Sequence, residues 1–450
     1  MYNVKNVLRL QQHSFSNEKI NLKKIINKLK KFKLALKRFD NEIYDSLKKD
    51  FNRTPFESYY SEIIHVQKEL NYFIKNIKKL YKPKKIKNSF KTHGYTKNYI
   101  VKRPHGCILI MTPFSHPILF SLISIIGAFS SGNKVILKLS PYAGNTNIVI
   151  RKLINVVFSV EEVFVINDAQ DNLTGLFDFN FDFVLFIGSQ KIGKLVSEKF
   201  ASRLIPTAIL LGGKCPAIID KTCDIKKSAN TLTWAKLINA GQSSIAPDYF
   251  LIHESIYDAF LKETIKSIEN QFPENTIDIN LPCIVNENAF NRLVQLTKDQ
   301  NIIYQKTHKP KLRKFFPTII EVTNTKNELM KEEMYGPIFL FIKYSKFEDI
   351  EKWVKLNRCS NSIYCFSKDK TFYKKIENNF ESNSFLLNDA AVQIYKQVQF
   401  GGVKNSGHGS FRFEHSYNMF TYNKTIIKAK KNMKFLFAPY KDLNSLKKKI

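Results

Sequence analysis

The spacing of hydrophobic and polar positions changes twice along the chain. From residue 17 to about residue 80, apolar residues recur three and four positions apart, which predicts amphipathic helices ending at a lysine-rich break near Pro83. The stretch YTKNYIVKR, residues 95–103, alternates apolar and polar positions and predicts a strand. From Gly106 onward, strand patterns such as GCILIM alternate with helical ones such as PILFSLISIIGAFSSG. This alternation predicts a parallel sheet with right-handed crossovers.

A second series of strands and helices is expected to begin near Thr207. Its strands are TAILLG, PAIID and DYFLIH, and its helices are expected over about 225–240 and over YDAFLKETIKSIENQF. The last segment, SFRFEHSYNMFTYNKTIIKAKK, is expected to be extended. The sequence therefore predicts two α/β lobes with a small β appendage, without internal repeats or low-complexity linkers.

Composition excludes several classes of protein. The six cysteines form no C-x-x-C motif or tight cluster and the nine histidines no H-E-x-x-H motif, which argues against a metal site or a disulfide framework. We therefore expect no metal and a reducing, cytoplasmic setting. The start, MYNVKNVLRLQQHSF, lacks the apolar core of a secretory signal. The longest apolar run, Pro117 to Gly132, is too short to span a bilayer, so no membrane anchor is expected.

The formal net charge of +32 admits two interpretations. Lysines could neutralise nucleic-acid phosphates, or they could reflect a compositionally biased genome. They spread along nearly the whole chain and accompany no recognised nucleic-acid-binding module, so we expect no nucleic-acid partner. Two blocks are denser, Lys23 to Arg38 and Lys78 to Lys91, and the first has helical spacing with a solvated lysine face.

Several short motifs follow predicted strands, where ligands bind in α/β sheets. FIGSQKIGKL follows a strand and opens a helix whose N–H groups could hold a phosphate, although a simple tight turn fits equally well. It nearly matches a P-loop, but Leu195 stands where Ser or Thr would hold Mg²⁺, which disfavours a P-loop ATPase. Lys138 ends another strand, where its side chain could contact a ligand or could simply be solvated at the strand end. The glycines of LLGGKCP allow close approach of a ligand or form a bulge.

The order and spacing of these motifs are far more specific than any one of them. TPFSHP, GAFSSGNKVILKLS, FIGSQKIGK, LLGGKCPAIID, NAGQSSIAPDY, EEMYGPI and FGGVKNSGHG together resemble the aldehyde dehydrogenase superfamily, most closely its class 3 branch. The resemblance extends from about residue 15 to about residue 440. It implies an α/β fold with a Rossmann-like cofactor domain, an α/β catalytic domain and a small β oligomerisation arm, assembled in a homodimer.

The resemblance also implies domain limits. It places the dinucleotide-binding domain at residues 1–82 and 101–207 and the catalytic domain at 208–410. The oligomerisation arm would comprise 83–100 and 411–430, followed by a C-terminal tail at 431–450.

The resemblance implies a nicotinamide dinucleotide cofactor. The family positions around it are matched by Lys138, Gly188, Ser189, Gly193, Leu211, Gly212, Glu333 and Tyr335. Lys138 matches a lysine that bonds the adenosine ribose, and Glu333 a glutamate that holds the nicotinamide ribose. Pro141 stands where a glutamate often follows, so no carboxylate excludes a 2′-phosphate and the cofactor is NAD or NADP.

The three catalytic positions of the family are all substituted. In the family a cysteine thiolate attacks the aldehyde, a glutamate activates water, and an asparagine holds the oxyanion. These positions align with Ser244, Leu210 and Ser115. A serine hydroxyl needs an adjacent base, which a leucine cannot supply. The ancestral reaction, NAD(P)-dependent oxidation of a small-molecule aldehyde to a carboxylic acid, is therefore expected to be impaired.

A shift in alignment cannot supply another nucleophile. No cysteine lies between Cys223 and Cys283, and Cys215 takes a position where the family has a small structural residue. Two other functions stay open. His116 could activate Ser244 in a serine hydrolase, or it could simply replace an aromatic residue that lines the substrate tunnel in the family. The chain could also be a non-catalytic partner of an active dehydrogenase.

Overall fold

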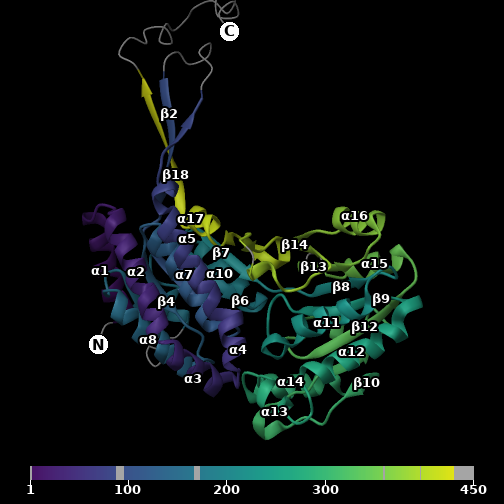
Figure 1. Cartoon of the computed structure of the whole chain (residues 1–450). Coiled ribbons are helices and arrows are strands. Elements are labelled where there is room, and N and C mark those ends of the chain that lie inside the picture. The colour runs from purple at the N-terminus through teal and green to yellow at the C-terminus, as the bar shows by residue number, and fades with distance from the viewer. Residues whose placement is uncertain (1–2, 88–95, 167–172, 358–359, 396, 430–450) are drawn as a thin grey trace, which may run out of the picture.

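The computed structural model describes residues 3–87, 96–166, 173–357, 360–395 and 397–429. Two α/β lobes lie side by side, and a narrow three-stranded arm projects from one of them (Figure 1). A single hydrophobic cluster runs through both lobes, joining residues such as Phe32, Leu185 and Phe250. Because the lobes share this core, the groups at their junction are held on one continuous scaffold.

The first lobe contains a six-stranded sheet in the order β16-β7-β6-β3-β4-β5. Its strands are β3 (Cys107–Met111), β4 (Lys134–Lys138), β5 (Val163–Val165), β6 (Phe183–Gly188), β7 (Thr207–Leu211) and β16 (Gly407–His408). Helices α7 (Pro117–Ser130), α8 (Gly144–Val157) and α10 (Gln190–Ala201) connect them. The first five strands are parallel, as the alternating pattern predicts, and only β16 runs antiparallel.

The second lobe contains a seven-stranded sheet in the order β10-β11-β12-β9-β8-β13-β14. Its strands are β8 (Cys215–Ile219), β9 (Pro247–His253), β10 (Ile302–Gln305), β11 (Thr318–Glu321), β12 (Ile338–Tyr344), β13 (Ser360–Phe366) and β14 (Ser382–Leu387). Its longer helices are α11 (Ile225–Leu237), α12 (Tyr257–Gln271), α14 (Glu287–Thr297), α15 (Phe347–Val354) and α16 (Lys370–Asn379). Only β10 is antiparallel.

The expectation that the second series begins near Thr207 is wrong by one strand. β7 pairs in parallel with β6, with Leu210 opposite Ile187, and therefore completes the first sheet. The second sheet begins at β8, whose first residue is the cysteine of LLGGKCP, separated by one residue from the two glycines. Propensity cannot separate these strands, because both are short apolar runs and only their pairing differs.

The N-terminal segment is helical, as its spacing predicts. It forms α1 (Val4–Asn17), α2 (Leu22–Arg38), α3 (Asp40–Phe51), α4 (Pro55–Ser58), a π-helical turn η1 (Tyr59–Ile63) and α5 (Ile64–Leu80). α1 begins well before residue 17, where the helical prediction started. The Asn3 side chain caps it by accepting from the backbone N–H of Lys5 at 2.7 Å.

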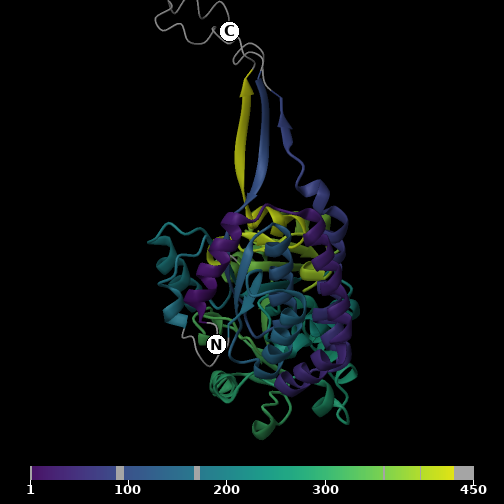
Figure 2. The ribbon, with the colours of Figure 1, turned by 90° about the vertical axis from the view of Figure 1, so that its left-hand side faces the viewer.

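The arm consists of β1 (Lys84–Ile86), β2 (Thr96–Pro104) and β18 (Thr421–Ala429) (Figure 2). β2 and β18 are antiparallel, from Pro104 opposite Thr421 to Thr96 opposite Ala429. The expected extended segment before β18 is partly helical, since α17 (Glu414–Met419) packs against α7. Gly127 of α7 permits this close approach, because a Cβ there would lie 2.7 Å from the Ser416 Cβ. The expected tail over 431–450 lies outside the described residues.

No helix among the described residues is both long and apolar enough to cross a membrane. The apolar run that begins at Pro117 forms the 14-residue helix α7. All of its residues are buried, so the absence of charged residues reflects a location at the centre of the core.

A substitution at Gly407 tests how closely β16 packs against β7 at the edge of the first sheet. Its φ is +102°, and a Cβ there would lie 1.8 Å from the Ile209 carbonyl oxygen. We expect Gly407→Ala to lower the free energy of unfolding by about 2 kcal/mol or more, measured by chemical denaturation. Gly144→Ala is the control, since nothing lies within 4 Å of the added Cβ. Equal stability of the two variants would contradict this account of β16.

Candidate functional site

The parallel strands bring several predicted residues to one edge of the first sheet. Lys138 ends β4, Gly188 ends β6 and Leu211 ends β7, while Ser115 lies shortly after the end of β3. Carboxyl ends of parallel strands meet at the same edge, which is where ligands bind in open α/β sheets. The structure therefore assembles at one edge residues that are far apart in sequence.

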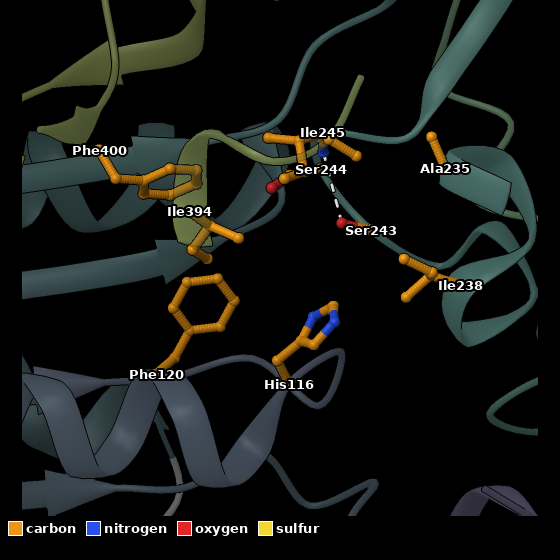
Figure 3. Close-up of a pocket in the computed structure, with 10 residues that line it drawn as sticks. His116, Phe120, Ala235, Ile238, Ser243, Ser244, Ile245, Ile394 and Phe400 are labelled. Carbon is orange, nitrogen blue, oxygen red and sulfur yellow. Dashed lines mark hydrogen bonds between the residues drawn. The ribbon is translucent and has the colours of Figure 1, made fainter. Parts of the chain in front are cut away.

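Ser244 lies opposite this edge, in the turn between α11 and β9. It is half-buried and lines a small pocket with His116, Phe120, Ser243, Ile394 and Phe400 (Figure 3). The pocket has a cavity volume of about 10 Å³. That space holds roughly one water. The wall is mostly apolar, so Ser244 is surrounded largely by aromatic and aliphatic side chains.

His116 and Ser244 share this pocket, but no hydrogen bond joins them. The bond drawn between the labelled residues runs from the Ile245 N–H to the Ser243 hydroxyl, at 3.5 Å (Figure 3). Burial, aided by the positive charge of Arg53, holds the pKa of His116 well below its usual range. The imidazole is therefore neutral at pH 7 but a weak base.

Leu210 lies in β7, opposite Gly407 on one side and Ile187 on the other. Its side chain is only 2% exposed and belongs to the cluster that also contains Ile394 and Phe400. An ionised carboxylate at this position would face apolar neighbours. The position aligned with the family glutamate thus packs as a core residue and has no group that could activate water.

Cys215 lies close to the backbone of Ser244. Its thiol is fully buried and donates to the Ser244 carbonyl oxygen at 3.6 Å and to the Gly213 carbonyl oxygen at 3.4 Å. Burial raises the pKa of this thiol well above its usual range. Cys215 therefore stays protonated and inaccessible, in agreement with the packing role predicted from its position.

A buried ion pair that the sequence did not reveal holds the segment containing Ser115. Arg53 and Glu62 form this pair with both side chains fully buried, and Arg53 also donates to the Ser115 carbonyl oxygen. The second oxygen of Glu62 accepts from the backbone N–H groups of Ile118 and Leu119, at 2.7 and 3.0 Å. Glu62 therefore caps the N-terminus of α7.

Asn239 connects this pair to the segment containing Ser244. Its side chain accepts from Arg53 Nε at 3.0 Å and donates to the Ser115 carbonyl oxygen at 2.9 Å. Its own φ is 53°, a left-handed conformation that the following residue, Ala240, also adopts. The buried Gln242 side chain closes the turn by donating to the Asn239 and Cys283 carbonyl oxygens. Several buried hydrogen bonds therefore hold the turn before Ser244 in a single conformation.

The beginning of α10 could hold a phosphate. Ser189 is the N-cap residue, and the first turn contains no acidic residue. Lys191 and Lys194 lie within the helix, so the local charge is positive. Gly193 lets α10 approach β7, because a Cβ there would lie 2.5 Å from the Leu211 side chain. This glycine thus has a packing role in addition to its place in the motif.

Glu333 lies against the glycines that follow β7. A Cβ on Gly212 would be 2.4 Å from both Glu333 carboxylate oxygens, so the carboxyl group lies directly against the backbone of this glycine. Burial and the nearby Asp248 raise the pKa of Glu333 to about 8. Asp248 itself pairs with Lys214 at 3.2 Å and Lys236 at 3.8 Å. The carboxyl group thus faces the strand-end region beside a buried charged cluster.

Tyr335 follows in the same segment and also has a left-handed backbone, with a φ of 50°. Its ring makes an edge contact with Phe114, at 6.0 Å between centroids. Phe114 in turn contacts the exposed Tyr142, which follows Pro141 after β4. These rings extend the strand-end edge towards solvent.

A Rossmann-like sheet, a second α/β sheet and a projecting arm define the class of the aldehyde dehydrogenase fold. A solved structure of this class, the substrate-bound state of Staphylococcus aureus AldH, matches 98% of this chain and 97% of its own. Its TM-score is 0.94 at 28% sequence identity. The model of the aldehyde dehydrogenase family matches residues 7–426, and the chain therefore belongs to this family.

Relatives with known names agree with this assignment. The chain is 30% identical to 4,4′-diaponeurosporen-aldehyde dehydrogenase of Staphylococcus aureus, over 89% of this chain and 88% of the relative. It is 29% identical to aldehyde dehydrogenase family 3 comG of Dictyostelium discoideum, over 92% and 88%. The resemblance to the class 3 branch and the expected fold are confirmed.

Removing Arg53 tests the buried network. We expect Arg53→Met to reduce the free energy of unfolding by about 3–5 kcal/mol, because it leaves the Glu62 carboxylate buried without its partner. Chemical denaturation measures the change. Lys152→Met is the control: Lys152 pairs with Glu42 at 3.4 Å, but both side chains are about half exposed, so less than about 1 kcal/mol is expected. A loss as small as that of the control would contradict the role of Arg53.

Proposed function

We propose that this chain retains the scaffold of an aldehyde dehydrogenase and binds NAD or NADP, but no longer oxidises aldehydes efficiently. The observation that carries the proposal is the joint state of the three catalytic positions. Ser244 donates no hydrogen bond to a base in the described pocket, Leu210 packs in the core, and Ser115 replaces the asparagine. Each change alone would slow the reaction, and together they leave no complete path from aldehyde to acid.

The residues at the strand-end edge fit a dinucleotide. The α10 N-terminus, with its basic residues and without an acidic first turn, would hold the pyrophosphate. Lys138 would bond the adenosine ribose and Glu333 the nicotinamide ribose, the latter beside Gly212, where a Cβ would obstruct the approach. When bound, the nicotinamide supplies a hydride acceptor. Pro141 leaves both NAD and NADP compatible with this edge.

The protein's own residues limit what could happen to an aldehyde. A Ser244 hydroxyl would have to lose its proton for attack, and the low pKa of His116 makes that transfer unfavourable. Cys215 cannot substitute, since its thiol is buried behind the Ser244 backbone. Loss of one oxyanion donor lowers rates about 10²–10³-fold in other enzymes, and the Ser115 side chain is shorter than the asparagine it replaces.

A serine hydrolase is the second candidate, because Ser244 and His116 line the same pocket. Such an enzyme would use His116 to take the Ser244 proton and would need the two side chains to move into hydrogen-bonding contact. The apolar wall formed by Phe120, Ile394 and Phe400 would then receive the acyl chain of an ester.

Direct titration with NAD and with NADP, followed by a panel of aldehydes, tests the proposal. We expect saturable binding of at least one cofactor and turnover far below the 1–10³ s⁻¹ typical of enzymes. The Ser115→Asn, Leu210→Glu, Ser244→Cys triple variant should increase aldehyde-dependent cofactor reduction at least about a hundredfold. If Leu210→Glu impairs folding, the single variant Ser244→Cys is used instead, and labelling of its thiol keeps the test valid.

Three outcomes are distinguishable. Ordinary aldehyde turnover by the unaltered protein would contradict the proposed loss of activity. Absence of binding to either cofactor would contradict the retained dinucleotide site. Ester hydrolysis that disappears in Ser244→Ala, with cofactor binding unchanged, would assign the hydrolase instead.

We further propose that the chain is a cytoplasmic homodimer assembled through its arm. β18 pairs with β2 along nine residues, and Tyr422 and Ile427 are exposed at 49% and 64%. Exposed apolar groups on a projecting ribbon are typical of an assembly surface. Sedimentation equilibrium should give twice the chain mass of 52.4 kDa, whereas a monomeric mass at micromolar concentration would exclude it.

A further inference from the structure

The excess of positive charge lies mainly in residues 1–104 and 421–450, which carry +18 and +8 of the total of +32. Residues 1–104 contain 26 of the 71 Lys and Arg residues but only 8 of the 39 Asp and Glu residues. Residues 105–420, three times as many, contain 36 basic and 30 acidic residues. Compositional bias alone would distribute the excess in proportion to length, so it does not account for this asymmetry.

The fold brings the two lysine-dense blocks of the sequence together. α2 contains the first block, and the end of α5 and β1 contain the described part of the second. The two helices pack side by side, with Lys33 Nζ donating to the Asn71 Oδ1 of α5 at 2.8 Å (Figure 1). Their apolar residues, such as Phe32 and Phe73, are buried against the core. The outer side, here named the α2–α5 face, carries exposed Lys30, Lys31, Lys37, Lys75, Lys78 and Lys79.

One carboxylate lies beside this face: Asp40, the first residue of α3, interacts electrostatically with Lys37. α2 contains no acidic residue, and the single acid of α5, Glu69, is fully buried in a pair with Arg412 at 3.1 Å. Glu162 pairs with Lys24 and Lys28 at the N-terminal end of α2. Within the part of the chain that the structure describes, none of the six lysines of the α2–α5 face forms an ion pair. Their fields therefore add over a continuous surface.

The chemistry of the face favours a lipid surface over nucleic acid. Its cations are lysines, which act as point charges, whereas base recognition commonly uses the bidentate guanidinium of arginine. The aromatic residues of both helices, Phe32, Tyr72 and Phe73, are buried or half-buried, so no stacking platform for bases is present on them. Leu34 projects among the lysines with 72% of its surface exposed. An apolar side chain surrounded by lysines suits the headgroup region of a bilayer.

We propose that the α2–α5 face docks the protein on an anionic bilayer surface. The lysine ammonium groups contact lipid phosphates and carboxylates, and Leu34 enters the acyl boundary. α2 does not insert, because its own apolar side forms part of the protein core. Binding is therefore electrostatic, reversible and weakened by salt.

Flotation with vesicles tests this proposal on the intact chain. The unaltered protein should bind phosphatidylcholine vesicles that contain phosphatidylserine, and it should not bind phosphatidylcholine alone. The Lys30→Gln, Lys31→Gln, Lys37→Gln variant should bind about a hundredfold more weakly, since each lysine contributes about fivefold. Leu34→Ser should weaken binding at high salt as well as at low salt, because its contribution is not electrostatic.

A matched variant separates the face from net charge. Lys262→Gln, Lys266→Gln, Lys298→Gln removes the same charge from exposed positions on α12 and just after α14. It should bind as the unaltered protein does, with all variants showing the same thermal unfolding midpoint. Equal weakening of both triple variants, or no binding to phosphatidylserine vesicles, would overturn the proposal. Tighter binding to RNA than to vesicles at physiological salt would assign the face to nucleic acid instead.

Discussion

The buried pair of Arg53 and Glu62 is the constraint on which the site depends. Two ions removed from water are tolerated only when every polar atom finds a partner. Here the partners are the Ser115 carbonyl, the Asn239 side chain and the first N–H groups of α7. Three segments distant in sequence are thereby fixed to each other. None of these bonds involves Ser244, Leu210 or the Ser115 hydroxyl, so the network does not depend on those three groups.

Polar groups are distributed unevenly around the junction of the lobes. Beside Glu333 the structure keeps a buried cluster of Lys214, Lys236 and Asp248, in which burial lowers the pKa of Lys236 to about 8. Around Ser244 the neighbours are aromatic and aliphatic. The buried charged groups therefore gather beside Glu333, whereas the wall around Ser244 is mostly apolar.

Local pattern was sufficient for much of the fold, and the ordered motifs were sufficient for the family. The parallel strands from β3 to β6 and the helices α7, α8 and α12 follow directly from hydrophobic spacing. The sheet to which β7 belongs did not follow, because strand pairing is a long-range property. Arg53, Glu62 and Asn239 also escaped prediction. In the sequence they are ordinary polar residues, and only burial, which folding creates, gives them their role.

The short strand β16 links the two lobes in an unexpected way. The chain leaves the first lobe after β7, builds the entire seven-stranded sheet, and then returns so that Gly407 and His408 hydrogen-bond to the edge of β7. The first sheet is therefore complete only after more than four hundred residues have been synthesised. Until then β7 presents an unprotected edge on a nascent chain, the kind of surface that pairs with other chains. During synthesis the two lobes therefore do not fold one after the other. The first lobe begins to form before the second, but its sheet is completed last.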